Sequence, residues 1–462
     1  MRFSNWQICE CVAAAALVFP VVAGLAGCGN GIKSPPTTPP ADTVTFPTAS
    51  TQGWLQQFGT GYVPTPPPSP RSSRNGDAAY GLVTDFQGNV IVLNKTYGAF
   101  PGFSNPNNAA EFVVTKFDSG GHQVWLQQFG TGMGDSPYAI AVDTQGNILV
   151  GGSTRGAFPG FTNSSGISQS VVIKLDPAGN ILWTQQFSPS TGPSQVASLA
   201  TDSQSNVVVG GNNKDAYNNG YGYISKLSGS NGTSLWAQGG NSTGNIVGVS
   251  GVAVDGQGNV IATGDFAVNP STIYMVAKLN GANGQTVWQQ QPIAFSPYGT
   301  QNAVYTQVAL DPQGDIFIDG LNGSSGWAQC TVAELSNSTG TAMWQQSFGA
   351  AQLCIPGSIA IVPSGNVLMT GGTIYPFFPS SSPPNTDDVF VAKLSSSGSG
   401  VWLQQFGTGQ EGAPGYTNAN ALTFVATDDQ SHAYVAGTTA SAFPGFTNPN
   451  GAFQVFVTQF GP

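Results

Sequence analysis

The chain is 462 residues long and only 7% of its residues are charged, against roughly 25% in an average soluble domain. Its net charge is −10, and lysine and arginine together number only 12. So few basic residues cannot neutralise a phosphate backbone, which excludes nucleic acid as a partner.

The N-terminus has the features of an export signal. An apolar run, VAAAALVFPVVAGLAG, begins at Val12; it is short for a membrane-spanning helix and has the length of a signal-peptide core. It ends in Leu25, Ala26, Gly27 and Cys28, which resemble the bacterial lipobox. That resemblance implies cleavage before Cys28 and acylation of this residue, and two or three acyl chains anchor a protein stably to a membrane. The alternative is an ordinary secretory signal with an incidental cysteine.

Residues after the cysteine predict a destination and a tether. Gly29 stands where an Asp would retain a lipoprotein in the inner membrane of enteric-type bacteria, so this analogy predicts export to the outer membrane or cell surface. The stretch SPPTTPPADTVTFPT, from Ser34, predicts a polar, proline-stiffened tether. We therefore expect a signal peptide over 1–27, a lipidated cysteine and tether over 28–52, and a folded domain over 53–462.

Beyond the tether the chain repeats itself. The eight residues WLQQFGTG occur three times, and a tryptophan recurs at intervals of roughly 50 to 70 residues, which indicates a repeat architecture. These tryptophans are Trp54, Trp125, Trp183, Trp236, Trp288, Trp344 and Trp402. Three other phrases recur between them, for example AIAVDTQGN, NILVGGST and VVIKLD. All are short, rich in β-branched and aromatic residues, and bounded by Gly, Asn, Asp or Ser, which predicts strands.

Seven copies of four strands predict an all-β fold, a seven-bladed β-propeller of four-stranded antiparallel blades. We name the strands of a blade A (small-apolar, innermost), B, C (with a lysine) and D (with the tryptophan, outermost). No Trp strand follows the last C strand, which ends at Phe460. The N-terminal strand at Trp54 is therefore expected to pair with the C-terminal strand and to close the ring. Closure protects two sheet edges that would otherwise be unpaired.

The repeats resemble the bacterial β-propeller repeat called SBBP, in phrases such as AVDTQGNILVGGST, the FPG loop and VVIKLDPAGNILW. The resemblance covers 54–462 and implies a secreted or surface propeller, but it says little about activity. Blades 3 to 5 depart from it because they lack the FPG loop. The wording ANGQTVW is more weakly similar to PQQ-like propeller repeats, which implies a possible role in outer-membrane assembly.

Strand order predicts two unequal faces. The A–B and C–D turns are short and share the bottom face, whereas the B–C and D–A connections are long and share the top face, where ligands are expected to bind. The B–C loops of blades 6, 7, 1 and 2 are contiguous in a closed ring and rich in phenylalanine. The candidate binding surface is Phe100, Phe103, Phe158, Phe161, Phe377, Phe378, Phe443 and Phe446. Alternatively, the first phenylalanine of each FPG loop, and Phe378, pack between blades.

Two charged series have structural interpretations. The Asp that recurs in six of the seven A–B turns is expected to cap its own turn rather than to bind a metal, because the series is spread over separate blades. Its members are Asp85, Asp143, Asp202, Asp255, Asp311 and Asp428. The strand-C lysines are expected to be structural and to extend their amino groups toward solvent. They are Lys116, Lys174, Lys226, Lys278 and Lys393, with Glu334 and Gln459 at the equivalent positions of the other two blades.

Cys330 opens a C strand and Cys354 lies in the following D–A loop, so both are expected at the top of blade 5. Export permits a disulfide between them. Closing that loop would stabilise the fold by about 3 kcal/mol.

No catalytic set stands out in the sequence. The two histidines, His122 and His432, fall in bottom turns of different blades, and there is neither an HExxH motif nor a P-loop. A carbohydrate-active enzyme with paired carboxylates stays open, since ring closure brings distant residues together. We expect a monomeric, lipid-anchored, non-catalytic binding or scaffold module without metal or cofactor. Its partner would be an envelope protein or a glycan.

Overall fold

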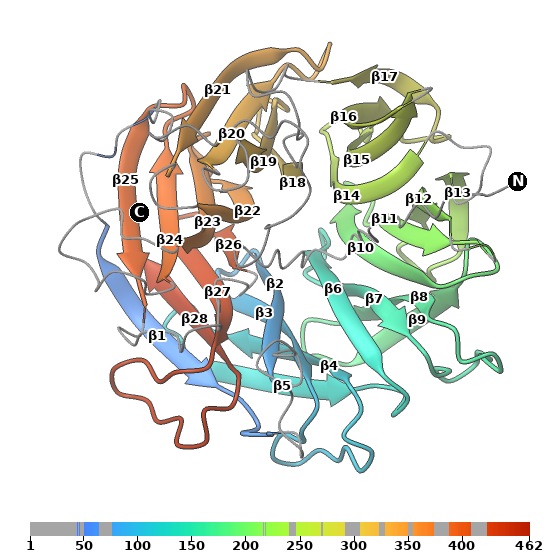
Figure 1. Cartoon of the computed structure of the whole chain (residues 1–462), viewed down its shortest axis with the longest axis vertical. Coiled ribbons are helices and arrows are strands. Elements are labelled where there is room, and N and C mark those ends of the chain that lie inside the picture. The colour runs from blue at the N-terminus through green and yellow to red at the C-terminus, as the bar shows by residue number, and fades with distance from the viewer. Residues whose placement is uncertain are drawn as a thin grey trace, which may run out of the picture.

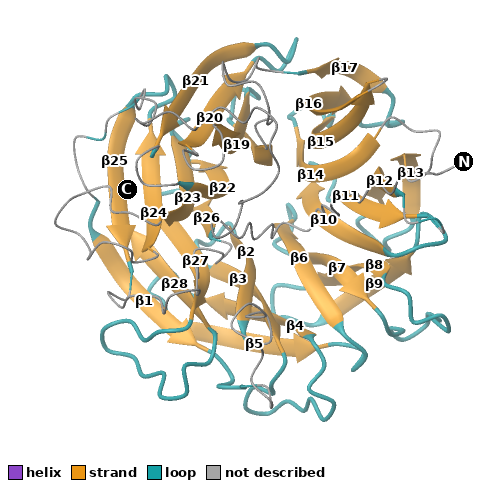
Figure 2. Ribbon diagram, viewed as in Figure 1, coloured by secondary structure: helices purple, strands orange, loops and turns teal. Residues whose placement is uncertain are grey.

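The computed structural model describes residues 44, 46, 50–63, 76–215, 217, 219–239, 246–268, 271–291, 305–322, 329–349, 354–373, 388–407 and 423–462. The strands form seven four-stranded sheets, which Figures 1 and 2 show arranged as a ring around a central axis. The predicted seven-bladed β-propeller is confirmed. Within these ranges, no helix has the length and apolar character needed to cross a lipid bilayer.

In blades 1 to 6 the strands follow the chain from the axis outward, in the order A, B, C, D. Blade 1 contains β2 (Ala78–Thr84), β3 (Val90–Thr96), β4 (Glu111–Phe117) and β5 (Gln123–Phe129). Blade 2 contains β6 (Asp135–Val142), β7 (Ile148–Thr154), β8 (Gln169–Leu175) and β9 (Ile181–Phe187). Blade 3 contains β10 (Ser194–Thr201), β11 (Val207–Lys214), β12 (Gly220–Leu227) and β13 (Ser234–Gly239). Blade 4 contains β14 (Ile246–Val254), β15 (Val260–Val268), β16 (Ser271–Leu279) and β17 (Thr286–Gln290). Blade 5 contains β18 (Tyr305–Leu310), β19 (Ile316–Asn322), β20 (Gln329–Leu335) and β21 (Ala342–Phe348). Blade 6 contains β22 (Ile355–Ile361), β23 (Val367–Thr373), β24 (Asp388–Leu394) and β25 (Gly400–Phe406).

Blade 7 joins the two ends of the chain. Its sheet order is β26 (Phe424–Thr427), β27 (Ala433–Thr439), β28 (Gln454–Phe460) and then β1 (Gln52–Phe58). β1 pairs antiparallel with β28, and the Oγ1 of Thr458 donates to the carbonyl of Trp54 at 2.8 Å. The ring of Phe58 packs 5.5 Å from that of Phe117 in blade 1. The predicted closure is therefore confirmed, and β1 also contributes to the junction between blades 7 and 1.

The core is divided among the blade junctions. Each of the seven hydrophobic clusters combines side chains from two neighbouring blades. Strands β3, β4 and β7 are buried at every position, because each central strand packs against a blade on both sides. No blade can bury both faces alone, so the ring is the unit that excludes water.

In six of the seven blades the recurring tryptophan forms a hydrogen bond to the next blade. The indole N–H of Trp125 donates to the carbonyl of Pro177, in the C–D turn of blade 2, at 3.2 Å. The indole N–H of Trp54, in β1 of blade 7, donates to the carbonyl of Ser119, in the C–D turn of blade 1, at 2.9 Å. The Nε1 of Trp402 is buried and has no hydrogen-bond partner among the described residues, because blade 7 is completed by two chain ends and has no C–D turn. These bonds explain why the Trp phrase recurs.

The top face is less uniform than expected. The B–C connection is long in blades 1, 2 and 7, but in blade 3 the pairing of Lys214 with Gly220 leaves a tight turn. In blade 4, Val268 pairs with Ser271, so that connection is also short. The prediction of long B–C loops is wrong for blades 3 and 4, because their B and C strands extend through the residues assigned to loops.

Candidate functional site

The FPG loops of blades 1, 2 and 7 share one geometry. In blade 1 the amide of Phe103 donates to the carbonyl of Phe100 at 3.0 Å, and the same bond closes the loops of blades 2 and 7. Gly102 has a φ of 88°, which is the conformation that the third residue of a type II turn requires, and proline at the second position matches that turn. The turn residues Pro101 and Gly102 are exposed.

A glutamine from the outer strand clamps each FPG loop. The amide of Phe100 donates to the Oε1 of Gln128 at 2.9 Å, and the Nε2 of Gln128 donates to the carbonyl of Gly98 at 2.9 Å. Gln186 holds the loop of blade 2 in the same way. In blade 7 the clamp is Gln57 of β1, so this loop is held only when the ring is closed.

An asparagine fixes the far end of each loop. The Nδ2 of Asn105 donates to the carbonyl of Ala109 at 2.8 Å. The equivalent bonds of Asn163 and Asn448 measure 2.9 and 2.8 Å. Each loop is therefore bonded at its start, its turn and its end, and its exposed tip is held in one conformation.

The first phenylalanine of each loop is a packing residue. Phe100, Phe158 and Phe443 are 7%, 5% and 6% exposed. Phe443 lies 6.4 Å from Phe406 of blade 6, measured between ring centroids. The assignment of these three residues to the binding surface is wrong, because all three are buried, and Phe158 and Phe443 fill junctions between blades.

The other phenylalanines of the candidate surface divide into two groups. Phe103, Phe161 and Phe446 are partly exposed, and the last two also contact the clusters of neighbouring junctions. Phe377 and Phe378 lie outside the described residues. The described part of the surface is therefore the three turn tips with one half-buried phenylalanine at each.

Two buried carboxylates that the sequence interpretation missed order the D–A loops. Asp135 accepts hydrogen bonds from the amide of Thr131 at 2.6 Å and from its hydroxyl at 3.0 Å. Asp77 accepts the same pair of bonds from Thr60. Burial raises the pKa of both carboxyls. The signal was the GTG that follows the strands of Trp54 and Trp125, since its threonine is the donor.

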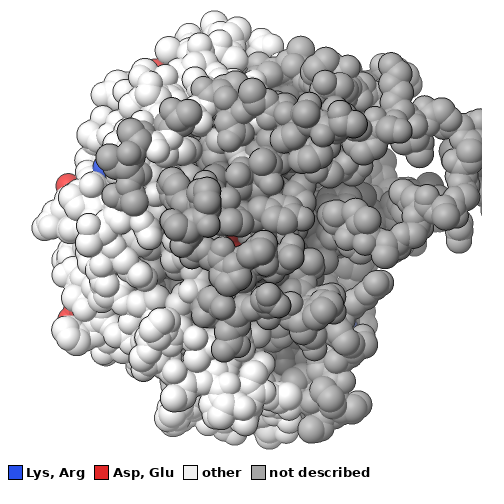
Figure 3. Space-filling view, turned by 60° about the vertical axis from the view of Figure 1, so that its left-hand side comes forward, with Lys and Arg blue, Asp and Glu red and all other residues white. Residues whose placement is uncertain are grey.

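The centre of the ring holds a hollow of about 430 Å³ lined by the innermost strands of all seven blades. Its lining includes Tyr80, Tyr138 and Phe424 together with small residues, and it contains no charged side chain. The outer surface is similarly poor in charge: Figure 3 shows only isolated charged atoms among the described residues on the side of β25 and β1. Recognition at such surfaces depends on shape and neutral hydrogen bonds.

On the bottom face, the A–B turns are capped as predicted. In blade 2 the amides of Gln145 and Asn147 both donate to the Oδ1 of Asp143 at 2.9 Å. The other oxygen of Asp143 lies 2.7 Å from the Nζ of Lys174. Burial alone would raise the pKa of Asp143, but the hydrogen bonds from Lys174 and Asn147 outweigh it and hold the pKa below its usual value.

The same ion pair is present in each of the first four blades, with Nζ–Oδ2 distances between 2.7 and 2.9 Å. These lysine side chains are only 4–11% exposed. The prediction that they extend toward solvent is wrong. Each lysine instead points between two blades, toward the turn of its own blade.

One repeat of the chain matches a known protein family. Residues 124–159 match the family model described as SBBP, beta-propeller repeat. The chain contains an SBBP repeat. The matched residues run from β5 through β6 and β7 into the FPG loop of blade 2, and they include the capped turn and the packing phenylalanine Phe158.

Other similarities are more distant. The chain is 23% identical over 308 residues to an uncharacterized WD repeat-containing protein of Acanthamoeba polyphaga mimivirus, covering 56% of this chain and 21% of that protein. The chain thus spans about a fifth of that relative's length. A structure of unknown function from Dyadobacter fermentans has 11% identity and a TM-score of 0.42, covering 88% of this chain and 99% of the other. A quinohemoprotein alcohol dehydrogenase from Comamonas testosteroni has 10% identity and a TM-score of 0.42, covering 83% and 75%. Values this low transfer no activity to the chain.

Blades 6 and 7 depart from the ion-pair pattern of blades 1 to 4. In blade 6, Val362 replaces the aspartate, and Lys393 has no ion-pair partner within the described ranges; burial lowers the pKa of Lys393. In blade 7, Asp428 accepts from the Nδ1 of His432 at 2.8 Å and from the hydroxyl of Tyr434 at 2.9 Å. Both histidines of the chain therefore serve bottom-face turns, since His122 likewise contacts Asp118.

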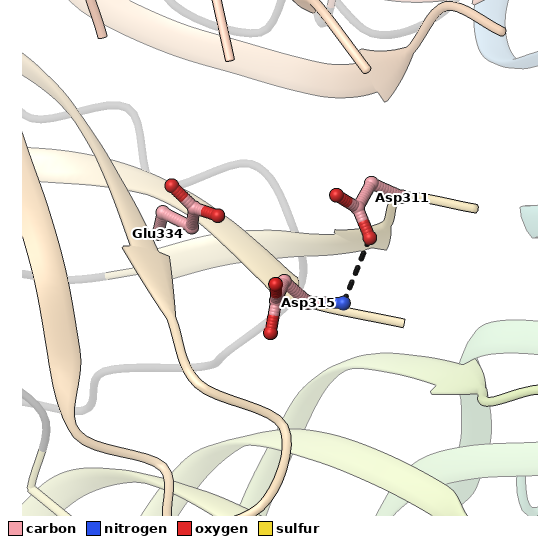
Figure 4. Close-up of side chains that lie close together, drawn as sticks. All are labelled: Asp311, Asp315 and Glu334. Atoms are coloured by element: carbon pink, nitrogen blue, oxygen red, sulfur yellow. Dashed lines mark hydrogen bonds between the residues drawn. The ribbon is translucent and has the colours of Figure 1, made fainter. Parts of the chain in front are cut away.

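Blade 5 gathers three carboxylates at the same place. Asp311, Asp315 and Glu334 each offer an oxygen within 4.8 Å of the others, and Figure 4 shows the three side chains gathered at the A–B turn, with Asp311 bonded to the amide of Asp315. Burial raises the pKa of Glu334, and the neighbouring Asp315 and Asp311 raise it further. These oxygen donors are the group best suited to a metal among the described residues.

At the top of blade 5 the structure contains the expected disulfide between Cys330 and Cys354. Both cysteines belong to the cluster between blades 5 and 6, and Val44 and Phe46 pack against it. The ring of Phe46 lies 5.2 Å from that of Phe348. Part of the predicted tether therefore lies on the propeller, where Phe46 contacts the end of a D strand as Phe443 does at the next junction.

Proposed function

We propose that the chain is a lipid-anchored propeller of the cell envelope that binds a protein partner through the top face of blades 7, 1 and 2 and catalyses no reaction. The observation that carries this proposal is the fixed conformation of the three FPG loops. Preorganised loops lose little conformational entropy on binding, so their exposed tips suit recognition. The low surface charge favours a partner that is recognised by shape and neutral hydrogen bonds.

The triple variant Phe103→Ser, Phe161→Ser, Phe446→Ser is expected to stay folded and to lose partner binding, because each change alters a half-buried residue beside an exposed tip. The matched control is Val124→Ser, Leu182→Ser, Leu235→Ser, whose side chains are exposed and lie on outer strands. Each protein is immobilised and exposed to detergent-solubilised envelope and to a glycan array. Equal capture of an envelope protein by the wild type, the triple variant and the control variant would contradict the proposal. Turnover of a glycan by the wild type would favour an enzyme instead.

The anchor is tested separately. Cys28→Ala is expected to remove the lipid and to shift the protein from the membrane fraction to the soluble exported fraction, because acyl chains supply the membrane affinity. The measurement is the intact mass of the mature protein together with its distribution after fractionation. An unmodified wild-type cysteine, or a mature N-terminus elsewhere, would show that the lipobox resemblance is misleading.

A further inference from the structure

Blades 1 to 4 each hold a cation at one equivalent place on the bottom face. In blade 2 the Nζ of Lys174 lies 2.7 Å from Asp143 and 2.8 Å from the carbonyl of Gly229 in the C–D turn of blade 3. In blade 3 the Nζ of Lys226 lies 2.9 Å from both Asp202 and the carbonyl of Gly281. In each case the lysine ammonium lies between the carboxylate of the A–B turn in its own blade and a backbone carbonyl of the next blade.

Blade 5 keeps this framework and reverses its charge. Glu334 pairs in register with Trp344, as Lys174 pairs with Trp183, so a carboxylate replaces the ammonium. Asp315 stands where the A–B turns of blades 1 to 4 and blade 6 carry an asparagine, and it adds a further negative charge. A neutral Asp–Lys pair has become a group of three carboxylates.

The carbonyl of the framework is also present in blade 5. The indole of Trp344 donates to the carbonyl of Ser396 at 3.0 Å, just as that of Trp183 donates to the carbonyl of Gly229 at 3.1 Å. Since Gly229 also accepts from the ammonium of Lys174, Ser396 presents the equivalent oxygen.

Glu334 has no positively charged partner among the described side chains. It is only 7% exposed. A buried carboxylate without a compensating charge is strongly destabilising. A hollow of about 350 Å³ borders the site, and its lining includes Asp311, Asp428 and Asp429. It offers an approach from the bottom face that is lined by carboxylates.

We propose that blade 5 binds a calcium ion where blades 1 to 4 hold a lysine ammonium. The ligands would be carboxylate oxygens of Asp311, Asp315 and Glu334, together with the carbonyl of Ser396 and water. Calcium takes six to eight such hard oxygen ligands, and extracellular modules bind it with dissociation constants of about 10⁻⁴–10⁻³ M. The ion links blades 5 and 6, as the lysines link earlier pairs of blades.

The test measures calcium binding to the full chain freed of divalent ions, by calorimetry and by thermal unfolding in chelator, magnesium or millimolar calcium. Wild type is expected to bind one calcium and to melt at higher temperature in calcium than in chelator, with a smaller effect of magnesium. The double variant Asp315→Asn, Glu334→Lys recreates the arrangement of blade 2, so it is expected to lose calcium binding and to melt independently of calcium.

Asp176→Asn, which changes a partly exposed bottom-face carboxylate of blade 2, is the matched control and is expected to bind calcium like wild type. Should the double variant not fold, Glu334→Gln takes its place and is expected to weaken calcium binding at least about tenfold. Absence of binding to wild type, or undiminished binding by the site variants, would overturn the proposal.

Discussion

A chain that begins at residue 59, and so lacks β1, is expected to lose its cooperative fold or to self-associate. Removal of β1 takes away Trp54 and Phe58, two partly buried aromatic side chains, from the junction between blades 7 and 1. Their combined loss is expected to cost about 3–5 kcal/mol, the value for one fully buried aromatic side chain. The truncation also leaves β28 with an unpaired edge, which can pair with another chain. Light scattering and urea unfolding would measure both effects.

The control for this truncation is a chain that begins at residue 50, which retains β1 and its bonds to β28. It is expected to be monomeric and to unfold in one transition. If the two proteins had the same stability and the same mass in solution, β1 would not be part of the folded ring.

Asp143→Ala is expected to lower the free energy of unfolding by about 3–5 kcal/mol, because it leaves the buried ammonium of Lys174 with only the carbonyl of Gly229 and no compensating negative charge. Since the pKa of Asp143 is held below its usual value in the folded protein, the ion pair stabilises the fold above the unfolded pKa of about 3.9. That contribution is lost as the pH falls through the folded pKa. The penalty of the substitution should therefore shrink in acid, as measured by urea unfolding at several pH values.

The matched control is Asp176→Ala, in the C–D turn of the same blade. Asp176 is a partly exposed turn cap with no ion-pair partner among the described residues, so its loss should lower the free energy of unfolding much less than the loss of Asp143 does. Equal losses for the two substitutions would mean that the buried ion pair contributes no more than the turn cap does.

Much of this fold could be predicted because its signals are local and repeated. Strand alternation and the DTQGN turns identify strands A and B without reference to distant residues, and the missing last Trp strand predicts the pairing of Trp54 with the C-terminal strand. The ion pairs could not be read so directly, because Asp143 and Lys174 belong to different phrases and meet only through packing. The repeats do show in sequence that blade 5 differs from the other blades. Glu334 replaces the strand-C lysine in the same blade in which Asp315 replaces the asparagine of the A–B turn.

The candidate site was harder to predict. In the phrase FPGF either phenylalanine could be exposed, and only the type II turn decides that Phe100 is buried while Phe103 remains partly exposed. Gln128 and Asn105 hold the loop through backbone atoms, which leave no pattern beyond their recurrence. Val44 and Phe46 lie within a proline-rich stretch whose composition predicted a tether. Their apolar side chains were the feature that indicated packing against the propeller instead.

Amide hydrogen exchange of the intact protein tests ring closure by β1 most directly. If β1 completes blade 7, the amides of 52–58 that bond to β28 are protected as strongly as those of 454–460, and both segments lose protection together as denaturant is raised. Rapid exchange across 52–58 while 454–460 remains protected would contradict the closed ring.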